Sequence, residues 1–221
     1  MKKDFLARED YVTSRNESKE ISFNCVNEDV LKLLVPKTVY PPREDSKMLG
    51  DCINNLNETK GKAVEIGCGT GLISIMLAKK GWIVDAFDIN PYAVISTKEN
   101  ISRASVKNSV TVNEGGLGEK NFSIPKETKL IVWNLPYLTP PNENEPRLEW
   151  IEEASMSDLE GEGWGHHLAD FLENSKDILN PELLVLLLQR KYPKSPSTMK
   201  YWSNLGWSHR VLKSKWFHDE K

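Results

Sequence analysis

The stretch EIGCGTG, residues Glu65–Gly71, constrains the fold more than any other part of the 221-residue chain. Its glycines Gly67, Gly69 and Gly71 follow a short apolar run typical of a buried strand and precede an apolar run with helical spacing. Because glycine has no Cβ atom, the backbone can turn sharply there and a ligand can lie directly against it. A strand, a glycine-rich turn and a helix in this order predict an α/β fold with a nucleotide-like ligand at the turn.

Strand and helix patterns alternate along most of the chain. Strands are expected at residues 62–67, 82–90, 109–113, 129–134 and 182–189, with a last strand at 208–214. Helices are expected from residue 42, over 72–81 and 91–105, after 161–165, and near 196–206. This alternation predicts a mostly parallel, twisted sheet with helices on both faces.

The N-terminal part differs in character from the rest. Residues 1–20 are polar and without periodicity, which predicts a polar N-terminal arm. Two apolar runs around the sequence NED then predict a hairpin that leads into the main domain. The chain length fits one α/β domain better than two, so residues 21–221 are expected to form a single domain.

The sequence carries no sign of a membrane or an oxidising compartment. Its longest apolar run, Leu183–Leu188, is far below the roughly 20 residues that a membrane span needs. The N-terminus is charged where a signal peptide is apolar, and Cys25, Cys52 and Cys68 lack metal-type or disulfide-framework spacing. These features predict a cytoplasmic protein.

Charge and histidine content narrow the function classes further. A net charge of -3 argues against a protein whose main role is to bind phosphate backbones, so a nucleic-acid partner is the less favoured prediction. His166 and His167 are adjacent at an expected helix start and so face different directions. No metal site is predicted.

The spacing of the glycines and of two carboxylates indicates the type of ligand. A dinucleotide fingerprint would need its third glycine at position 72, which is Leu, so a pyrophosphate cofactor is disfavoured. Asp88 ends the next strand, where a carboxylate can accept hydrogen bonds from both hydroxyls of a ribose, and Ile89 follows it. The alternative is a tight turn with a helix-capping Asp and no ligand.

The glycine pattern resembles the first motif of class I S-adenosylmethionine methyltransferases. In that family an acidic residue two positions before the first glycine faces the methionine end of the cofactor. The resemblance implies a Rossmann-like fold that binds S-adenosylmethionine and releases S-adenosylhomocysteine. It also implies that the cofactor is held by Glu65, Gly67, Gly69, Gly71, Asp88, Ile89 and Asn134. For an adenine contact only Glu114 is available, and its alternative role as a solvated loop residue is favoured.

The stretch IVWNLPYLTPP, residues Ile131–Pro141, resembles the family's substrate motif of the Asn-Pro-Pro-Tyr type. The resemblance implies that the side-chain oxygen of Asn134 and the next carbonyl accept both N–H bonds of a planar nitrogen. Pro136 belongs to the same motif, and Tyr137 would pack on the face of the acceptor. Such a nitrogen is a poor nucleophile, so positioning and electrostatic stabilisation must provide the catalysis. The alternative is a strand end with an Asn cap and a turn-forming proline.

The segment VYPPREDS, residues Val39–Ser46, extends the resemblance to the HemK-like glutamine methyltransferases. Together with EIGCGTG, DINPYAV, ENI and NLPYLTPP, it resembles the archaeal and eukaryotic branch that acts on translation termination factors, over residues 39–190. The resemblance implies a protein substrate with a Gly-Gly-Gln motif and a small zinc-binding activator subunit. It also implies that Tyr40, Glu44 and Asp45 lie over the cofactor.

The chain departs from this pattern in ways that keep other functions open. Leu135 replaces the first proline of the motif, and NLPY is the form found in rRNA adenine dimethylases. Class I folds usually continue into a seventh, antiparallel strand, for which the sequence shows no candidate. The sheet would then have an unpaired edge, near residues 109–113 or 208–214, that a partner protein is expected to cover. The alternatives to glutamine methylation are therefore an rRNA or other nucleic-acid adenine methyltransferase and a non-catalytic cofactor-binding protein.

Overall fold

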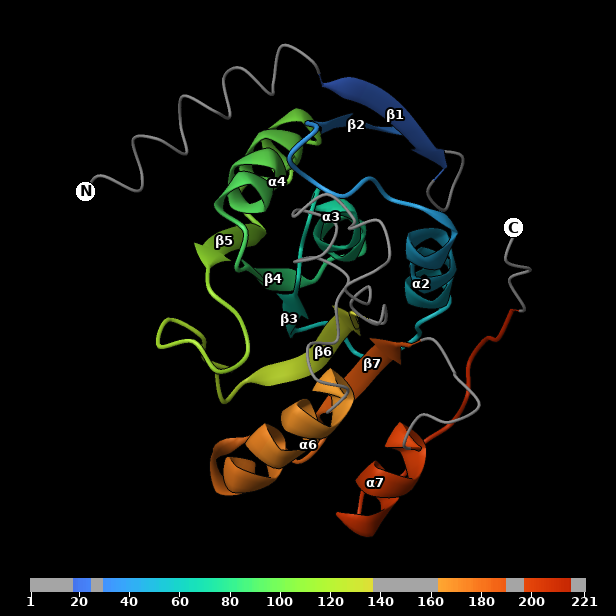
Figure 1. Cartoon of the computed structure of the whole chain (residues 1–221), viewed down its shortest axis with the longest axis vertical. Coiled ribbons are helices and arrows are strands. Elements are labelled where there is room, and N and C mark those ends of the chain that lie inside the picture. The colour runs from blue at the N-terminus through green and yellow to red at the C-terminus, as the bar shows by residue number, and fades with distance from the viewer. Residues whose placement is uncertain (1–17, 25–29, 137–162, 190–196, 216–221) are drawn as a thin grey trace, which may run out of the picture.

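The computed structural model describes residues 18–24, 30–136, 163–189 and 197–215. Its centre is a five-stranded parallel sheet with the order β5-β4-β3-β6-β7 (Figure 1). The strands are β3 (Lys62–Ile66), β4 (Ile83–Asp88), β5 (Val110–Glu114), β6 (Thr128–Asn134) and β7 (Leu184–Leu188). The parallel sheet predicted from the alternating pattern is confirmed, and the glycine-rich turn follows its central strand.

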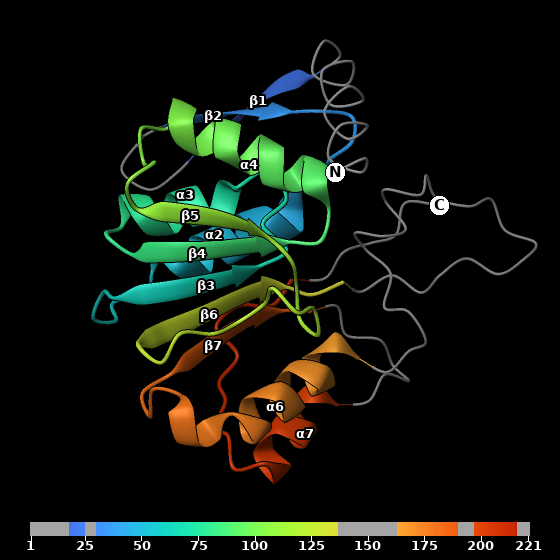
Figure 2. The same ribbon diagram turned by 90° about the vertical axis from the view of Figure 1, so that its left-hand side faces the viewer.

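Helices cover both faces of this sheet, as Figure 2 shows. The helices are α2 (Glu44–Asn54), α3 (Leu72–Lys79), α4 (Pro91–Arg103), α6 (Trp164–Asn174), the 3-10 helix η3 (Lys176–Ile178) and α7 (Thr198–Asn204). Side chains of α2, α3 and α4 share one core with the sheet, and side chains of α6 and α7 share a second core on the opposite face. Ala63 and Val64 are both fully buried, because β3 is covered on each side. Among the described residues, every helix is too short or too polar to cross a lipid bilayer.

The N-terminal hairpin is also confirmed. Strands β1 (Lys19–Asn24) and β2 (Val30–Val35) form a separate antiparallel pair. β1 begins at Lys19, inside the range predicted as the polar arm, and residues 1–17 of that arm lie outside the described residues.

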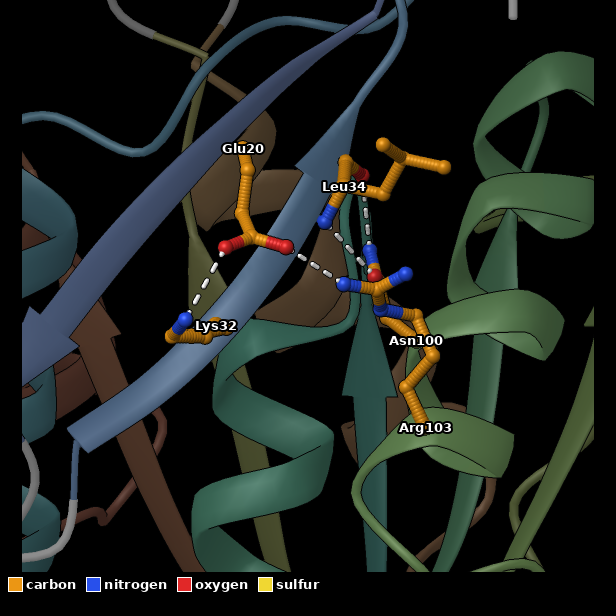
Figure 3. Close-up of polar contacts among 5 residues, drawn as sticks. All are labelled: Glu20, Lys32, Leu34, Asn100 and Arg103. Carbon is orange, nitrogen blue, oxygen red and sulfur yellow. Dashed lines mark hydrogen bonds and ion pairs between the residues drawn. The ribbon is translucent and has the colours of Figure 1, made fainter.

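Polar contacts hold the hairpin against α4 (Figure 3). The side chain of Asn100 accepts a hydrogen bond from the backbone N–H of Leu34 and donates one to its carbonyl oxygen, each at 2.9 Å. Glu20 forms ion pairs with Arg103 at 2.7 Å and with Lys32 at 3.3 Å. The buried amide fixes the hairpin more firmly than the exposed ion pairs, because water screens exposed charges.

The prediction of a strand at residues 208–214 is wrong. This segment is exposed and has no regular secondary structure. Its basic side chains instead form ion pairs with acidic side chains in and after α2, namely Arg210 with Glu58, Lys213 with Asp51, and Lys215 with Glu44. Val211 is 65% exposed, so the segment lacks the buried apolar face that stabilises a strand. β7 is therefore the last strand on this side of the described sheet.

Candidate active site

The glycine-rich loop between β3 and α3 opens the site at the carboxyl ends of the strands. Gly69 and Gly71 have φ angles of 54° and 81°, in the left-handed region that favours glycine. A Cβ atom on Gly71 would lie 2.9 Å from Cγ2 of Thr97, whereas a Cβ atom on Gly69 would meet no atom of the described residues within 4 Å. Gly71 thus allows close packing of the loop on α4, and Gly69 leaves its own approach open to a ligand.

Two buried polar residues of α4 hold this loop. The hydroxyl of Thr97 donates to the carbonyl oxygen of Gly69 at 2.9 Å, and the amide of Asn100 donates to that of Thr70 at 3.0 Å. The same Asn100 side chain forms hydrogen bonds with the backbone of Leu34 in the hairpin, so it joins the hairpin to the glycine-rich loop. Sequence reasoning assigned no role to Thr97 or Asn100, although polar residues three apart on an otherwise apolar helix face were a usable signal.

Asp88 lies at the end of β4, beside the glycine loop. One of its carboxylate oxygens accepts the N–H of Gly69 at 2.8 Å, and the other accepts the N–H of Asn90 at 2.9 Å. Burial raises the pKa of Asp88, and these two backbone hydrogen bonds oppose that rise. Each oxygen keeps a second lone pair, so the fixed carboxylate is suited to accept hydrogen bonds from a diol.

Glu65 lies in β3, on the face that α3 covers. Its carboxylate accepts a hydrogen bond from the hydroxyl of Ser74, a residue that sequence reasoning missed. Burial raises the pKa of Glu65 from 4.5 to about 8, against the lowering effect of Ser74 and with an added rise from the charge of Asp88. A cationic group bound beside Glu65 would favour its ionised form.

Ile89 supplies an apolar surface next to Asp88. This residue is 60% exposed, although it directly follows a buried strand. A Cβ atom added to Gly116 would lie 2.8 Å from Cγ2 of Ile89, so this glycine lets the β5 loop approach closely. The exposed face of Ile89 is suited to pack against a flat ring.

The segment Val39–Ser46, which the resemblance places over the cofactor, begins near the same ends of the strands. The side-chain amide of Asn90 donates to the carbonyl oxygen of Thr38 at 3.1 Å, two residues before Tyr40. The guanidinium group of Arg43 lies over the Tyr40 ring, 4.8 Å from its centre. The side chain of Glu44, in contrast, is 63% exposed and pairs with Lys215, so the structure does not bring it to the other predicted site residues.

Asp45 and Asn134 are brought together from positions 89 residues apart. The side-chain amide of Asn134 donates to Oδ2 of Asp45 at 2.9 Å, and Asp45 is buried, with 8% of its surface exposed. Oδ1 of Asn134 is buried and has no hydrogen-bond partner among the described residues. An unsatisfied buried oxygen costs free energy, so this oxygen is available to accept a hydrogen bond from a ligand. Pro136 is described, whereas Tyr137 lies outside the described residues.

The register of the sheet places Asn134 next to the glycine loop. Ile66 of β3 pairs with Trp133 of β6, so the next residue of each strand puts Asn134 level with Gly67. Leu135, which stands where the resemblance has a proline, uses its N–H to donate to the carbonyl oxygen of Leu188 at 2.9 Å. The replacement thus adds a hydrogen bond between β6 and β7 next to the site.

The histidine pair has structural contacts. His166 stacks on Tyr201, with ring centres 4.2 Å apart. Within the part of the chain that the structure describes, no three His, Cys, Asp or Glu side chains are grouped so that they could hold a metal ion.

Comparison with known proteins assigns the family. The model of the methyltransferase small domain family matches residues 44–163, more than half of the chain. The chain belongs to this family. The fold is that of the class I, S-adenosylmethionine-dependent methyltransferases, and the matched residues include the glycine loop, Asp88 and Asn134. A solved ribosomal protein L11 methylase of Lactobacillus delbrueckii subsp. bulgaricus has the same fold, with a TM-score of 0.56 and 15% identity, over 83% of this chain and 79% of its own.

Curated relatives of this methyltransferase carry names that concern glutamine. A Methanocaldococcus jannaschii protein provisionally named protein N5-glutamine methyltransferase is 34% identical over 82% of this chain and 87% of its own length. The release factor glutamine methyltransferase of Leptospira interrogans is 33% identical over 77% of this chain, which spans only 54% of that longer protein. Relatives named as rRNA and tRNA methyltransferases match over 35% to 55% of the chain.

The residues at the carboxyl ends of the strands fit S-adenosylmethionine, the cofactor that the family implies. Glu65 and Asp88 are two buried carboxylates, which suit a ligand with a positive charge and a ribose diol. Gly69 has space beside it, as far as the described residues go, for such a ligand to lie against the backbone. The side-chain oxygen of Asn134, which has no partner among the described residues, is available to accept a hydrogen bond from a second molecule.

Proposed function

We propose that this methyltransferase modifies the side-chain amide of a glutamine in a translation termination factor, within a Gly-Gly-Gln motif. The observation that carries the proposal is the buried Oδ1 of Asn134, which has no partner among the described residues and needs an N–H donor. The relatives named for glutamine methylation support it, because they match over most of the chain. A cytoplasmic setting is part of the proposal.

In this proposal Asn134 and Leu135 act by positioning the glutamine nitrogen for methyl transfer. When bound, S-adenosylmethionine would supply a methyl group on a positively charged sulfur; in-line attack of a nitrogen on the methyl carbon would form the N–C bond, break the S–C bond, and release S-adenosylhomocysteine and one N–H proton. Asn134 Oδ1 would accept one N–H of the glutamine amide and the carbonyl oxygen of Leu135 the other, which orients the nitrogen lone pair. Since an amide nitrogen is a weak nucleophile, this alignment must supply much of the rate enhancement. Pro136 would fix the backbone beyond Leu135, and Tyr137 would cover the acceptor.

The cofactor contacts follow the same proposal. Glu65 would face the methionine end, the backbone of Gly67, Gly69 and Gly71 would lie along the ligand, and Asp88 would bind the ribose. Ile89 would pack against the adenine. The lead-in residues Tyr40, Glu44 and Asp45 were assigned to the cofactor by resemblance. The structure supports a position near it for the segment of Tyr40, and supports a contact with Asn134 for Asp45.

Methylation of adenine in RNA is the second candidate. The exocyclic amine of adenine also carries two N–H bonds on a planar nitrogen, so it fits the same pair of acceptors. The NLPY form of the motif and the relatives named as rRNA and tRNA methyltransferases favour it. The net charge of -3 argues against it, because RNA binding depends on basic surfaces.

One experiment separates these candidates. Purified protein, methyl-labelled cofactor and a cell extract are incubated, and the labelled product is treated with protease or nuclease. Protease-sensitive label that maps by mass spectrometry to a Gly-Gly-Gln glutamine is the expected result. Nuclease-sensitive label would transfer the assignment to RNA. Saturation with cofactor and no transfer to any nitrogen acceptor would indicate a cofactor-binding protein without catalysis.

We also propose that a small protein, of the zinc-binding activator type, covers an open edge of the sheet. Within the described part of the chain, β5 and β7 are the edge strands of the sheet. Alternate residues of a parallel strand direct their backbone groups to opposite sides, so Val185 and Leu187 of β7 face away from β6. Such an edge can pair with another chain. Addition of a copurifying small protein should raise the melting temperature or the transfer rate. A monodisperse isolated chain with full activity, indifferent to such proteins, would contradict the proposal.

A further inference from the structure

The two oxygens of the Asp45 carboxylate contact different partners. Oδ1 accepts the backbone N–H of Ser46 at 2.7 Å and the hydroxyl of Ser46 at 3.3 Å. Oδ2 accepts the side-chain amide of Asn134 at 2.9 Å. Asp45 is buried in the first turn of α2, where the helix holds its backbone in place. The carboxylate is therefore held on one side by its own helix and faces Asn134 with the other.

This contact determines which way the Asn134 amide points. Carboxylate oxygens only accept hydrogen bonds, so Asn134 must turn its NH2 group toward Asp45. Its Oδ1 then points away from Asp45, and that oxygen is the buried one without a partner among the described residues. A neighbouring carboxylate also polarises the amide and makes its oxygen a stronger acceptor.

We infer that Asp45 is a positioning residue that sets the hydrogen-bond polarity of the acceptor site. By holding the NH2 group of Asn134, it makes the site select a methyl acceptor that donates an N–H. The inference rests on the proposed function in one respect, the placement of the acceptor at Asn134. It assigns to Asp45 a role different from the cofactor contact implied by resemblance.

Replacement of Asp45 by Asn should reverse this polarity. The N–H of Ser46 still needs an acceptor, so the new amide keeps its oxygen on that side and turns its NH2 group toward Asn134. Two NH2 groups cannot bond each other, so Asn134 rotates and offers its oxygen to residue 45. The side chain of Asn134 then presents its NH2 group to the site in place of its oxygen. The N–H of the glutamine amide would face another hydrogen-bond donor and could not bond to it.

The test measures acceptor binding without turnover. Protein saturated with S-adenosylhomocysteine is titrated by calorimetry with two peptides that differ only at one position, Gly-Gly-Gln and Gly-Gly-Met. Methionine has nearly the shape of glutamine and no N–H donor, and neither side chain is charged. The wild-type protein should prefer the Gln peptide by about tenfold or more, the scale of one buried hydrogen bond. In Asp45→Asn this preference should fall to about one.

A matched control and a rescue variant separate this role from a general effect on α2. Asp51→Asn removes a carboxylate from the same helix that pairs with Lys213 on the surface, and it should keep the wild-type preference. The double variant Asp45→Asn with Asn134→Asp restores one carboxylate and one amide in exchanged positions, so an acceptor oxygen again faces the site. It should recover most of the lost preference for the Gln peptide. An unchanged preference in Asp45→Asn would overturn the inference.

A second readout keeps the inference testable if the proposed substrate is wrong. If the wild-type protein binds neither peptide, the glutamine assignment fails. The role of Asp45 is then tested by the NMR resonances of the side-chain NH2 group of Asn134. A hydrogen bond to a carboxylate should shift one of these protons downfield and slow its exchange with water. Both effects should vanish in Asp45→Asn and persist in Asp51→Asn. Resonances identical in the wild type and in Asp45→Asn would refute the positioning role of Asp45.

Discussion

The backbone N–H of Leu135 donates to the carbonyl oxygen of Leu188 at 2.9 Å, so the β6–β7 ladder extends past Asn134. Asn134 therefore lies within the hydrogen-bonded ladder, because the next residue, Leu135, is also bonded to β7. A proline at position 135, as in the related motif, would have no N–H for this bond. The contact gives the departure from the motif a structural role at the site.

Replacement of Leu135 by Pro should lower the stability of the protein and keep the carbonyl that the proposed acceptor needs. The variant loses both the packing of Leu135 and its hydrogen bond to Leu188. Leu135→Ala loses only the packing, so it is the matched reference. The free energy of unfolding should be about 1 to 3 kcal/mol lower for Leu135→Pro than for Leu135→Ala, measured by urea denaturation. Equal stability of the two variants would mean that the hydrogen bond contributes nothing.

Asp88→Ala should weaken the binding of S-adenosylmethionine by about 1.5 to 3 kcal/mol, the scale of hydrogen bonds to a charged group. The reason is the loss of the proposed ribose contact together with the acceptor of the Gly69 N–H. Calorimetry gives the affinity. Asp85→Ala, on the same strand, removes a carboxylate that pairs with Lys62 at 3.0 Å and should leave the affinity within a few fold. Equal affinities for both variants would place the ribose elsewhere.

The pKa of Glu65 predicts how stability depends on pH in the free protein. Because this pKa is raised from 4.5 to about 8, the folded state binds a proton that the unfolded state releases. The stabilisation is thus complete below pH 4.5 and is lost as the pH rises to about 8. The slope should approach about 1.4 kcal/mol per pH unit at most. Urea denaturation at several pH values measures it.

Glu65→Gln should flatten this dependence above the range in which Asp88 titrates. The pKa of Asp88 is raised too, so it adds a slope of the same sign that the Gln variant retains. A cationic ligand favours ionised Glu65, so cofactor affinity should rise with pH in the wild type up to about pH 8 and rise less in Glu65→Gln. Parallel pH profiles for the two proteins would exclude a contact between Glu65 and the charged end of the cofactor.

Asn134→Ala should abolish methyl transfer and leave cofactor affinity within a few fold. The amide is assigned to the acceptor, and its loss removes the oxygen that would align the nitrogen. Transfer is measured with labelled cofactor and a Gly-Gly-Gln peptide, and affinity by calorimetry. If a folded Asn134→Ala variant no longer bound cofactor, the acceptor site would have to be placed elsewhere.

Asn100→Asp should destabilise the protein far more than Arg103→Ala, although both residues join α4 to the hairpin (Figure 3). The Asp carboxylate cannot donate to the carbonyl oxygens of Leu34 and Thr70, and it becomes a buried charge without those partners. The expected loss is above about 3 kcal/mol. Arg103→Ala removes an exposed ion pair with Glu20 and should cost below about 1 kcal/mol. Thermal unfolding compares them.

Local patterns predicted most elements of this fold. The helix expected over residues 91–105 forms as α4, Pro91–Arg103, because its proline start and apolar spacing are local properties. The strand expected at 208–214 does not form, although the segment contains Val211 and Leu212. Ion pairs from Lys213 and Lys215 to α2 hold it instead, and the acidic partners lie far away in sequence.

The amino-acid sequence alone determined the glycine turn, the Asp88 carboxylate at the next strand end and the family motifs, because each depends on residues close together along the chain. Only the tertiary structure decided that Asp45, rather than Glu44, reaches Asn134, since neighbouring residues of a helix point in different directions. It also decided that Asn100 joins the hairpin to the glycine loop. Contacts between distant segments depend on how helices pack on the sheet, and no local spacing encodes that packing.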